Sequence, residues 1–251
     1  MKVPSREGRR RLRLPRSAIS KTDPKRGATL VELIVAMSIL SVLVAVLFGA
    51  FEMGTRIFRD TNVRQSTENQ LRSIKLLLER DANHTNIWLC NKNPAPRSVT
   101  VGGDTFQRDA LSMATLKDWD APGSYSTDEE SLRAMFDRYV VWYATTEVPQ
   151  GKLFRQLVDP PPVSGGFTTP YAGLSPNINN NPELNANVFH SRPMSSDVMD
   201  FTTGVNFGNG TITVTLRLKA DGQLRPGTQV RTEENLQVSF MFQPKNSWPQ
   251  I

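Results

Sequence analysis

One stretch of 19 residues constrains this chain more than any other. Residues 33–51 (LIVAMSILSVLVAVLFGAF) contain no charged side chain, and Ser38 and Ser41 are the only polar side chains among them. At about 1.5 Å per residue, an α-helix of this length nearly spans the ~30 Å hydrocarbon layer of a bilayer. A buried helix of a water-soluble protein would normally carry a polar stripe. The stretch therefore predicts a transmembrane helix.

The residues directly before this stretch form a second pattern. Lys25 and Arg26 precede Gly27, and Glu32 is the last residue before the apolar run. A carboxylate in this place costs roughly 2–3 kcal/mol if it enters lipid without a partner, so its presence indicates a function. A basic pair, a glycine and a carboxylate five residues later resemble the N-terminus of type IV pilin-like proteins. The resemblance covers residues 25–55, about an eighth of the chain.

The resemblance implies how the N-terminus is processed. In that family a prepilin peptidase cleaves after the glycine, which here is Gly27, and the mature chain would begin at Ala28. Thr29, Leu30 and Glu32 then match the family's usual second, third and fifth residues. Ala28 departs from the family, which most often has an N-methylated phenylalanine as the first mature residue. Glu32 is implied as the residue that pairs with a neighbouring subunit during assembly.

Two other interpretations of the apolar stretch stay open from the residues alone. A plain signal anchor would orient in the same way, because the basic residues again stay on the cytoplasmic side. A cleaved secretory signal peptide is less consistent with the sequence, because its apolar core is usually 7–15 residues long. The only small-residue cleavage site for it would lie near residues 48–50, inside the apolar run.

The charge of the chain is concentrated in its first 27 residues. They hold ten Lys and Arg against Glu7 and Asp23, a net charge of +8, whereas the whole chain is +6. The remaining residues therefore carry −2, and the high isoelectric point does not by itself indicate nucleic acid as a partner. We expect no nucleic-acid partner, although Arg9, Arg10 and Arg11 leave a DNA-uptake role open. The basic block instead predicts a cytoplasmic leader and a C-terminal part on the other side of the membrane. The resemblance implies that this membrane is the inner membrane and that the C-terminal part lies in the periplasm.

Beyond the apolar run the sequence predicts an α+β protein. One long helix is expected over residues 28–82, transmembrane over 33–51 and amphipathic at its end, where Leu71, Ile74 and Leu78 repeat at helical spacing. Alternating or apolar patterns then predict antiparallel strands. These expected strands cover residues 98–101, 110–114, 139–144, 152–158, 211–219 and 236–242. The end of the helix is expected to pack on this strand-rich globular domain, residues 83–251.

A region rich in proline and asparagine interrupts the predicted strands. Residues 159–197 contain seven prolines and six asparagines, which disfavour sheet pairing. We expect an irregular surface loop there, and a loop of this length is usually a functional or partner-contacting segment. Asparagine and aspartate oxygens also suit calcium, but the spacing of an EF-hand is absent from the sequence.

The sequence offers little support for an enzyme. His84 and His190 are its only histidines, and neither belongs to a metal-ligand motif such as HExxH. Cys90 is the only cysteine, so we expect it to be buried and unreactive rather than paired or bound to zinc. We therefore predict no catalytic residue, no metal site and no cofactor.

Together these patterns favour a minor pilin or minor pseudopilin. The size of the strand-rich part resembles the J-type pseudopilin of type II secretion and the W-type minor pilin. The partners implied are the prepilin peptidase, other pilin-like subunits and inner-membrane lipid. The alternative is a membrane-anchored periplasmic binding module that never joins a filament. The two differ at Glu32, since an anchor has no need of that carboxylate.

Overall fold

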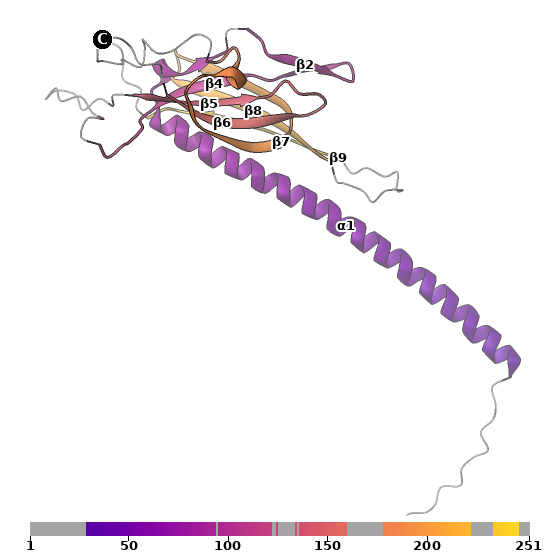
Figure 1. The fold of residues 1–251 in the computed structure, drawn as a ribbon. Helices are drawn as coiled ribbons and strands as arrows, with labels where there is room; N and C mark the ends of the chain where they lie inside the picture. The colour runs from indigo at the N-terminus through magenta and orange to yellow at the C-terminus, as the bar shows by residue number, and fades with distance from the viewer. Residues whose placement is uncertain are drawn as a thin grey trace, which may run out of the picture. The chain divides into compact units, whose positions relative to one another are not determined.

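One long α-helix and a set of antiparallel strands make up the structure, a computed structural model (Figure 1). It describes residues 29–93, 95–121, 124, 134, 136–159, 178–221 and 233–245. Helix α1 (Leu30–His84) is continuous over 55 residues, within two residues of the predicted bounds at each end. By its contacts the chain divides into two units, Met1–Met53 and Gly54–Ile251, and α1 contributes to both.

Seven of the described strands of the second unit form one antiparallel sheet. Its order is β1-β4-β5-β6-β7-β8-β9, so the strands from β4 onward form a meander in which each pairs with the next along the chain. The strands are β1 (Asn91–Lys92), β4 (Ala110–Thr115), β5 (Arg138–Ala144), β6 (Gly151–Val158), β7 (Val188–Asn206), β8 (Thr211–Asp221) and β9 (Glu233–Phe242). A separate hairpin pairs β2 (Ser98–Val101) with β3 (Asp104–Gln107). The predicted α+β class is confirmed.

The last turns of α1 pack on one face of this sheet. Leu71, Ile74 and Leu78 are buried there in one hydrophobic cluster with Trp142 of β5 and Leu216 of β8. These helical positions are three or four residues apart, so they lie on one side of α1. The predicted leucine stripe is thus the surface that joins the helix to the sheet. For this reason the part of α1 from Gly54 onward belongs to the same unit as the strands.

Strand β5 is buried on both of its faces. Val140, Trp142 and Ala144 join the cluster under α1, whereas Tyr139 and Tyr143 join a second cluster on the opposite face. Alternate residues of a strand point to opposite faces, so a run without polar side chains suits a strand covered twice. Strand β8 shows the other pattern: Ile212 and its alternate neighbours are buried under α1, and the threonines between them are not.

The prediction of an irregular loop over residues 159–197 is wrong from Val188 onward, where the 19-residue strand β7 begins. Pro193 and Arg192 lie in the first part of this strand, which pairs with β6 but, among the described residues, not with β8. A proline without an amide hydrogen is tolerated where one side of a strand is unpaired. Register shifts in the β6–β7 pairing accommodate it further.

The segment before β7 is also more ordered than predicted. Ile178 belongs to the second hydrophobic cluster, and the Asn179 amide donates hydrogen bonds to the Asn91 carbonyl (3.2 Å) and the Ser112 hydroxyl (3.1 Å). A short 3₁₀ helix η3 (Pro182–Leu184) follows, and Arg97 forms an ion pair of 3.1 Å with Glu183. Residues 160–177 of the predicted loop lie outside the described residues.

Candidate functional site

Helix α1 begins with a reciprocal cap that involves the candidate assembly residue. The Thr29 backbone amide donates to the Glu32 carboxylate (2.8 Å), and the Glu32 amide donates to the Thr29 hydroxyl (3.3 Å). This is a capping box, in which residues three apart each satisfy an amide that the helix leaves without a partner. The sequence analysis missed it, although Thr29-Leu30-Val31-Glu32 has the required spacing. Gly27 and Ala28 lie outside the described residues.

The apolar part of α1 has the properties of a membrane span. Within the described part of the chain, α1 is the one helix long and apolar enough to cross a membrane, and none of its most apolar window is buried against protein. Its polar side chains are satisfied inside the helix. The Ser38 hydroxyl donates to the Ile34 carbonyl and the Ser41 hydroxyl to the Met37 carbonyl, each at 2.8 Å. The segment therefore exposes almost no unsatisfied polar group to lipid.

The other end of α1 is held to the sheet by a buried ion pair. Arg155 of β6 donates two hydrogen bonds to the Asp81 carboxylate, at 2.7 and 2.9 Å, and the Trp142 indole donates a third at 2.9 Å. The side chain of Asp81 is 4% exposed and that of Arg155 is 12% exposed. A two-pronged contact of this kind fixes orientation as well as distance. It sets how α1 lies on the sheet, and no sequence pattern had indicated it.

The described residues offer no metal-binding cluster. No group of three or more His, Cys, Asp or Glu side chains among them is placed to hold a metal ion. His84 at the end of α1 lies against the Trp119 ring, 4.8 Å between centroids. Cys90 is buried, as predicted, and its thiol donates to the Asn86 carbonyl. Burial raises the pKa of this thiol from its ordinary value of 9.0 to about 12, so it stays protonated at neutral pH.

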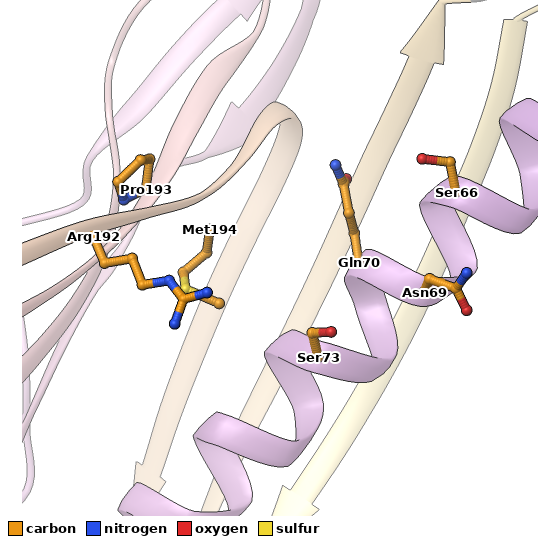
Figure 2. Close-up of a pocket in the computed structure, with 7 residues that line it drawn as sticks. All are labelled: Ser66, Asn69, Gln70, Ser73, Arg192, Pro193 and Met194. Carbon is orange, nitrogen blue, oxygen red and sulfur yellow. The ribbon is translucent and has the colours of Figure 1, made fainter.

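A shallow pocket lies between α1 and β7 (Figure 2). Its volume is about 350 Å³, and α1 lines one side while β7 lines the other. The lining residues are Ser66, Asn69, Gln70, Ser73, Arg192, Pro193 and Met194. Most ligand sites for small molecules are enclosed and largely apolar. This pocket has hydroxyl and amide groups and one guanidinium, and it contains none of the residues that the sequence analysis singled out as candidate sites.

Comparison with known families gives a match at the N-terminus. Residues 23–48 match the family described as the prokaryotic N-terminal methylation motif, and the matched segment contains Gly27, Ala28 and Glu32. No curated protein and no solved structure matches the chain. The chain therefore has a prepilin-type N-terminus, which indicates a type IV pilin-like protein.

Proposed function

We propose that this protein is a minor pilin or minor pseudopilin, a structural subunit without enzymatic activity. In this proposal residues 33–51 hold it in the inner membrane, and the strand-rich domain faces the periplasm. The observation that carries the proposal is the position of the methylation motif, which runs directly into the apolar part of α1. The same helix ends in the core of a strand-rich domain. One element would therefore serve both as the membrane anchor and as part of the domain core.

The charge distribution supports the proposed orientation. The leader, residues 1–27, carries a net charge of +8, and positively charged segments next to a span stay on the cytoplasmic side. The domain after the span would then cross to the periplasm. The J-type pseudopilin and the W-type minor pilin are the subtypes we favour, because of the size of the domain and because a single cysteine allows no disulfide within the chain.

Processing of the N-terminus tests this proposal. In cells with an active prepilin peptidase, we expect the membrane-extracted protein to begin at Ala28, as measured by intact-protein mass spectrometry. Gly27→Leu should block cleavage, because the side chain fills the place next to the scissile bond. Gly49→Leu is the matched control: a Cβ at Gly49 meets no atom within 4 Å, and this variant should be cleaved like the wild type. A wild-type protein that keeps its leader would overturn the proposal.

A further inference from the structure

The turn between β7 and β8 contains the only Asn-Gly pair of the sequence, Asn209-Gly210. Asn206 pairs with Thr211 across the two strands, so residues 207–210 form the β7–β8 turn. Gly210 has a φ of 63°, in the left-handed region that favours glycine, so the turn itself requires a residue of this kind. Glycine also has no Cβ, and the asparagine side chain before it can therefore reach the next backbone nitrogen without a steric barrier.

The surroundings of this pair leave both reacting groups accessible. Asn209 is exposed, and even a Cβ placed on Gly210 would meet no atom within 4 Å. Within the described part of the chain, neither the Asn209 side-chain amide nor the Gly210 backbone amide forms a hydrogen bond. Neither group has to be released from a protein partner before the two can meet. Water also reaches the turn freely, because Asn206, Phe207 and Gly208 are exposed as well.

Asn206, at the end of β7, provides a comparison beside the same turn. It is also exposed, but its side-chain oxygen accepts a hydrogen bond from the Asn209 backbone amide at 3.1 Å. The residue after it is Phe207, whose ring stacks on Trp88 with 5.5 Å between centroids and 12° between planes. The side chain of Asn206 is thus engaged, and the backbone nitrogen that follows it carries a bulky, packed residue. The two asparagines share solvent and pH but differ in local geometry.

We propose that Asn209 is a site of spontaneous deamidation. The backbone nitrogen of Gly210 loses its proton to water or hydroxide and attacks the side-chain carbonyl carbon of Asn209. The new C–N bond closes a five-membered succinimide ring, and ammonia leaves with a proton from water. A second water molecule then opens the ring at one of its two carbonyl carbons. Opening at the side-chain carbonyl gives aspartate at position 209, and opening at the main-chain carbonyl gives isoaspartate. The net reaction consumes one water and releases one ammonia.

The modification changes the turn in two ways. Either product carries a carboxylate, which is ionised at neutral pH because its ordinary pKa is about 3.9. Isoaspartate also adds one carbon to the main chain between β7 and β8, next to the stacked rings of Phe207 and Trp88. The reaction needs only water, so this inference goes beyond the proposed function and does not depend on it. It predicts that older molecules of this protein carry one more negative charge than newly made ones.

The test follows the full-length, detergent-solubilised protein over time by mass spectrometry of the peptide that contains residues 206–211. Its mass should rise by about 1 Da at Asn209, with aspartate and isoaspartate both present. The rate should rise with pH, because the attacking nitrogen must first lose its proton. Deamidation at Asn206 should be about tenfold slower or more. Asn209→Gln keeps the amide but requires a six-membered ring, so the rate at position 209 should fall about tenfold or more. The matched control, Asn235→Gln at an exposed position of β9, should leave the rate at Asn209 unchanged.

The same measurement in guanidinium chloride gives the rate for the unfolded chain. The rate at Asn209 in the folded protein should lie within about tenfold of this reference, because the turn leaves both groups accessible. A folded protein that stays unmodified while the unfolded chain reacts would overturn the proposal, since the turn would then protect Asn209. Equal rates at Asn206 and Asn209 in the folded protein would overturn it as well. Circular dichroism melts check that Asn209→Gln and Asn235→Gln retain the fold.

Discussion

At the scale of single residues, we propose a second task for Glu32 beside its cap, and its chemistry allows us to separate the two. Its carboxylate accepts a hydrogen bond from the Thr29 amide in the capping box. After cleavage at Gly27 the α-amine of Ala28 would also carry a positive charge at neutral pH. A positive charge is unfavourable at a helix N-terminus, and a nearby carboxylate offsets it. In an assembly, Glu32 would instead pair with the Ala28 amine of a neighbouring subunit.

Replacing Glu32 by glutamine removes the charge but keeps a side chain that can complete a capping box. We expect Glu32→Gln to be inserted and cleaved like the wild type. Its incorporation into the assembly should fall about tenfold or more, because the Ala28 amine of a neighbouring subunit loses its charged partner in a medium of low dielectric constant. Cross-linking to the other pilin-like subunits in membranes measures incorporation. Glu32→Ala should show the same defect together with a less stable helix start.

A control variant at Thr29, the other residue of the capping box, distinguishes the loss of the cap from the loss of the charge. Thr29→Ala removes the hydroxyl that accepts from the Glu32 amide but leaves the carboxylate in place. If the charge matters, this variant should assemble better than Glu32→Gln. Equal incorporation of Glu32→Gln and wild type would favour the alternative of a plain membrane anchor.

At the scale of elements, the junction between α1 and the sheet depends on the pair formed by Asp81 and Arg155. Removing one member of a buried pair leaves the other charge without compensation, at a cost of about 3 kcal/mol or more. We therefore expect Asp81→Ala to lower the free energy of unfolding by about 3 kcal/mol. Urea denaturation of the detergent-solubilised protein, followed by circular dichroism, measures this loss.

Glu79→Ala provides the comparison for Asp81→Ala. Glu79 lies two residues earlier in α1 but is exposed, so its removal should change the free energy of unfolding by no more than about 0.5 kcal/mol. A double variant with Asp81→Ala and Arg155→Met should recover part of the stability, since no buried charge then remains alone. A loss of similar size in Glu79→Ala and Asp81→Ala would contradict the role given to the pair.

The elements that the sequence predicted correctly are those with a strong local pattern. Helix α1 has an apolar run followed by a leucine stripe, and β8 alternates strictly between buried side chains and side chains that are at least partly exposed. No strand was predicted over any part of β7. In its first half Pro193 and its neighbours look like a loop, and only the pairing with β6 makes that segment a strand. Tertiary pairing of this kind leaves no periodic pattern in the segment itself.

The same limit applies to the candidate site. Gly27, Ala28 and Glu32 could be predicted as candidates because their spacing is local, and all three lie within the matched segment, residues 23–48. The contact of Asp81 with Arg155 joins residues 74 positions apart, so no spacing rule reveals it.

At the scale of the whole molecule, cleavage would change the sign of the net charge. The full chain carries +6 and the leader carries +8, so the mature protein would carry −2. We expect the isoelectric point to fall from about 9.7 to below 7 on maturation. Isoelectric focusing in a non-ionic detergent measures the change, and uncleaved Gly27→Leu should focus with the precursor. A processed protein that still focuses at basic pH would mean that the cut removes less of the basic block.

The burial of Cys90 has a practical consequence. Its pKa of about 12 lowers the thiolate fraction at pH 8 about a thousandfold relative to a pKa of 9.0, and no other cysteine is present. We therefore expect the native chain to react only very slowly with maleimides and other thiol reagents. A fluorophore or spin label can be attached at a single introduced cysteine without first removing the natural one. Orientation and neighbour distances then become measurable in intact cells on an otherwise unaltered protein.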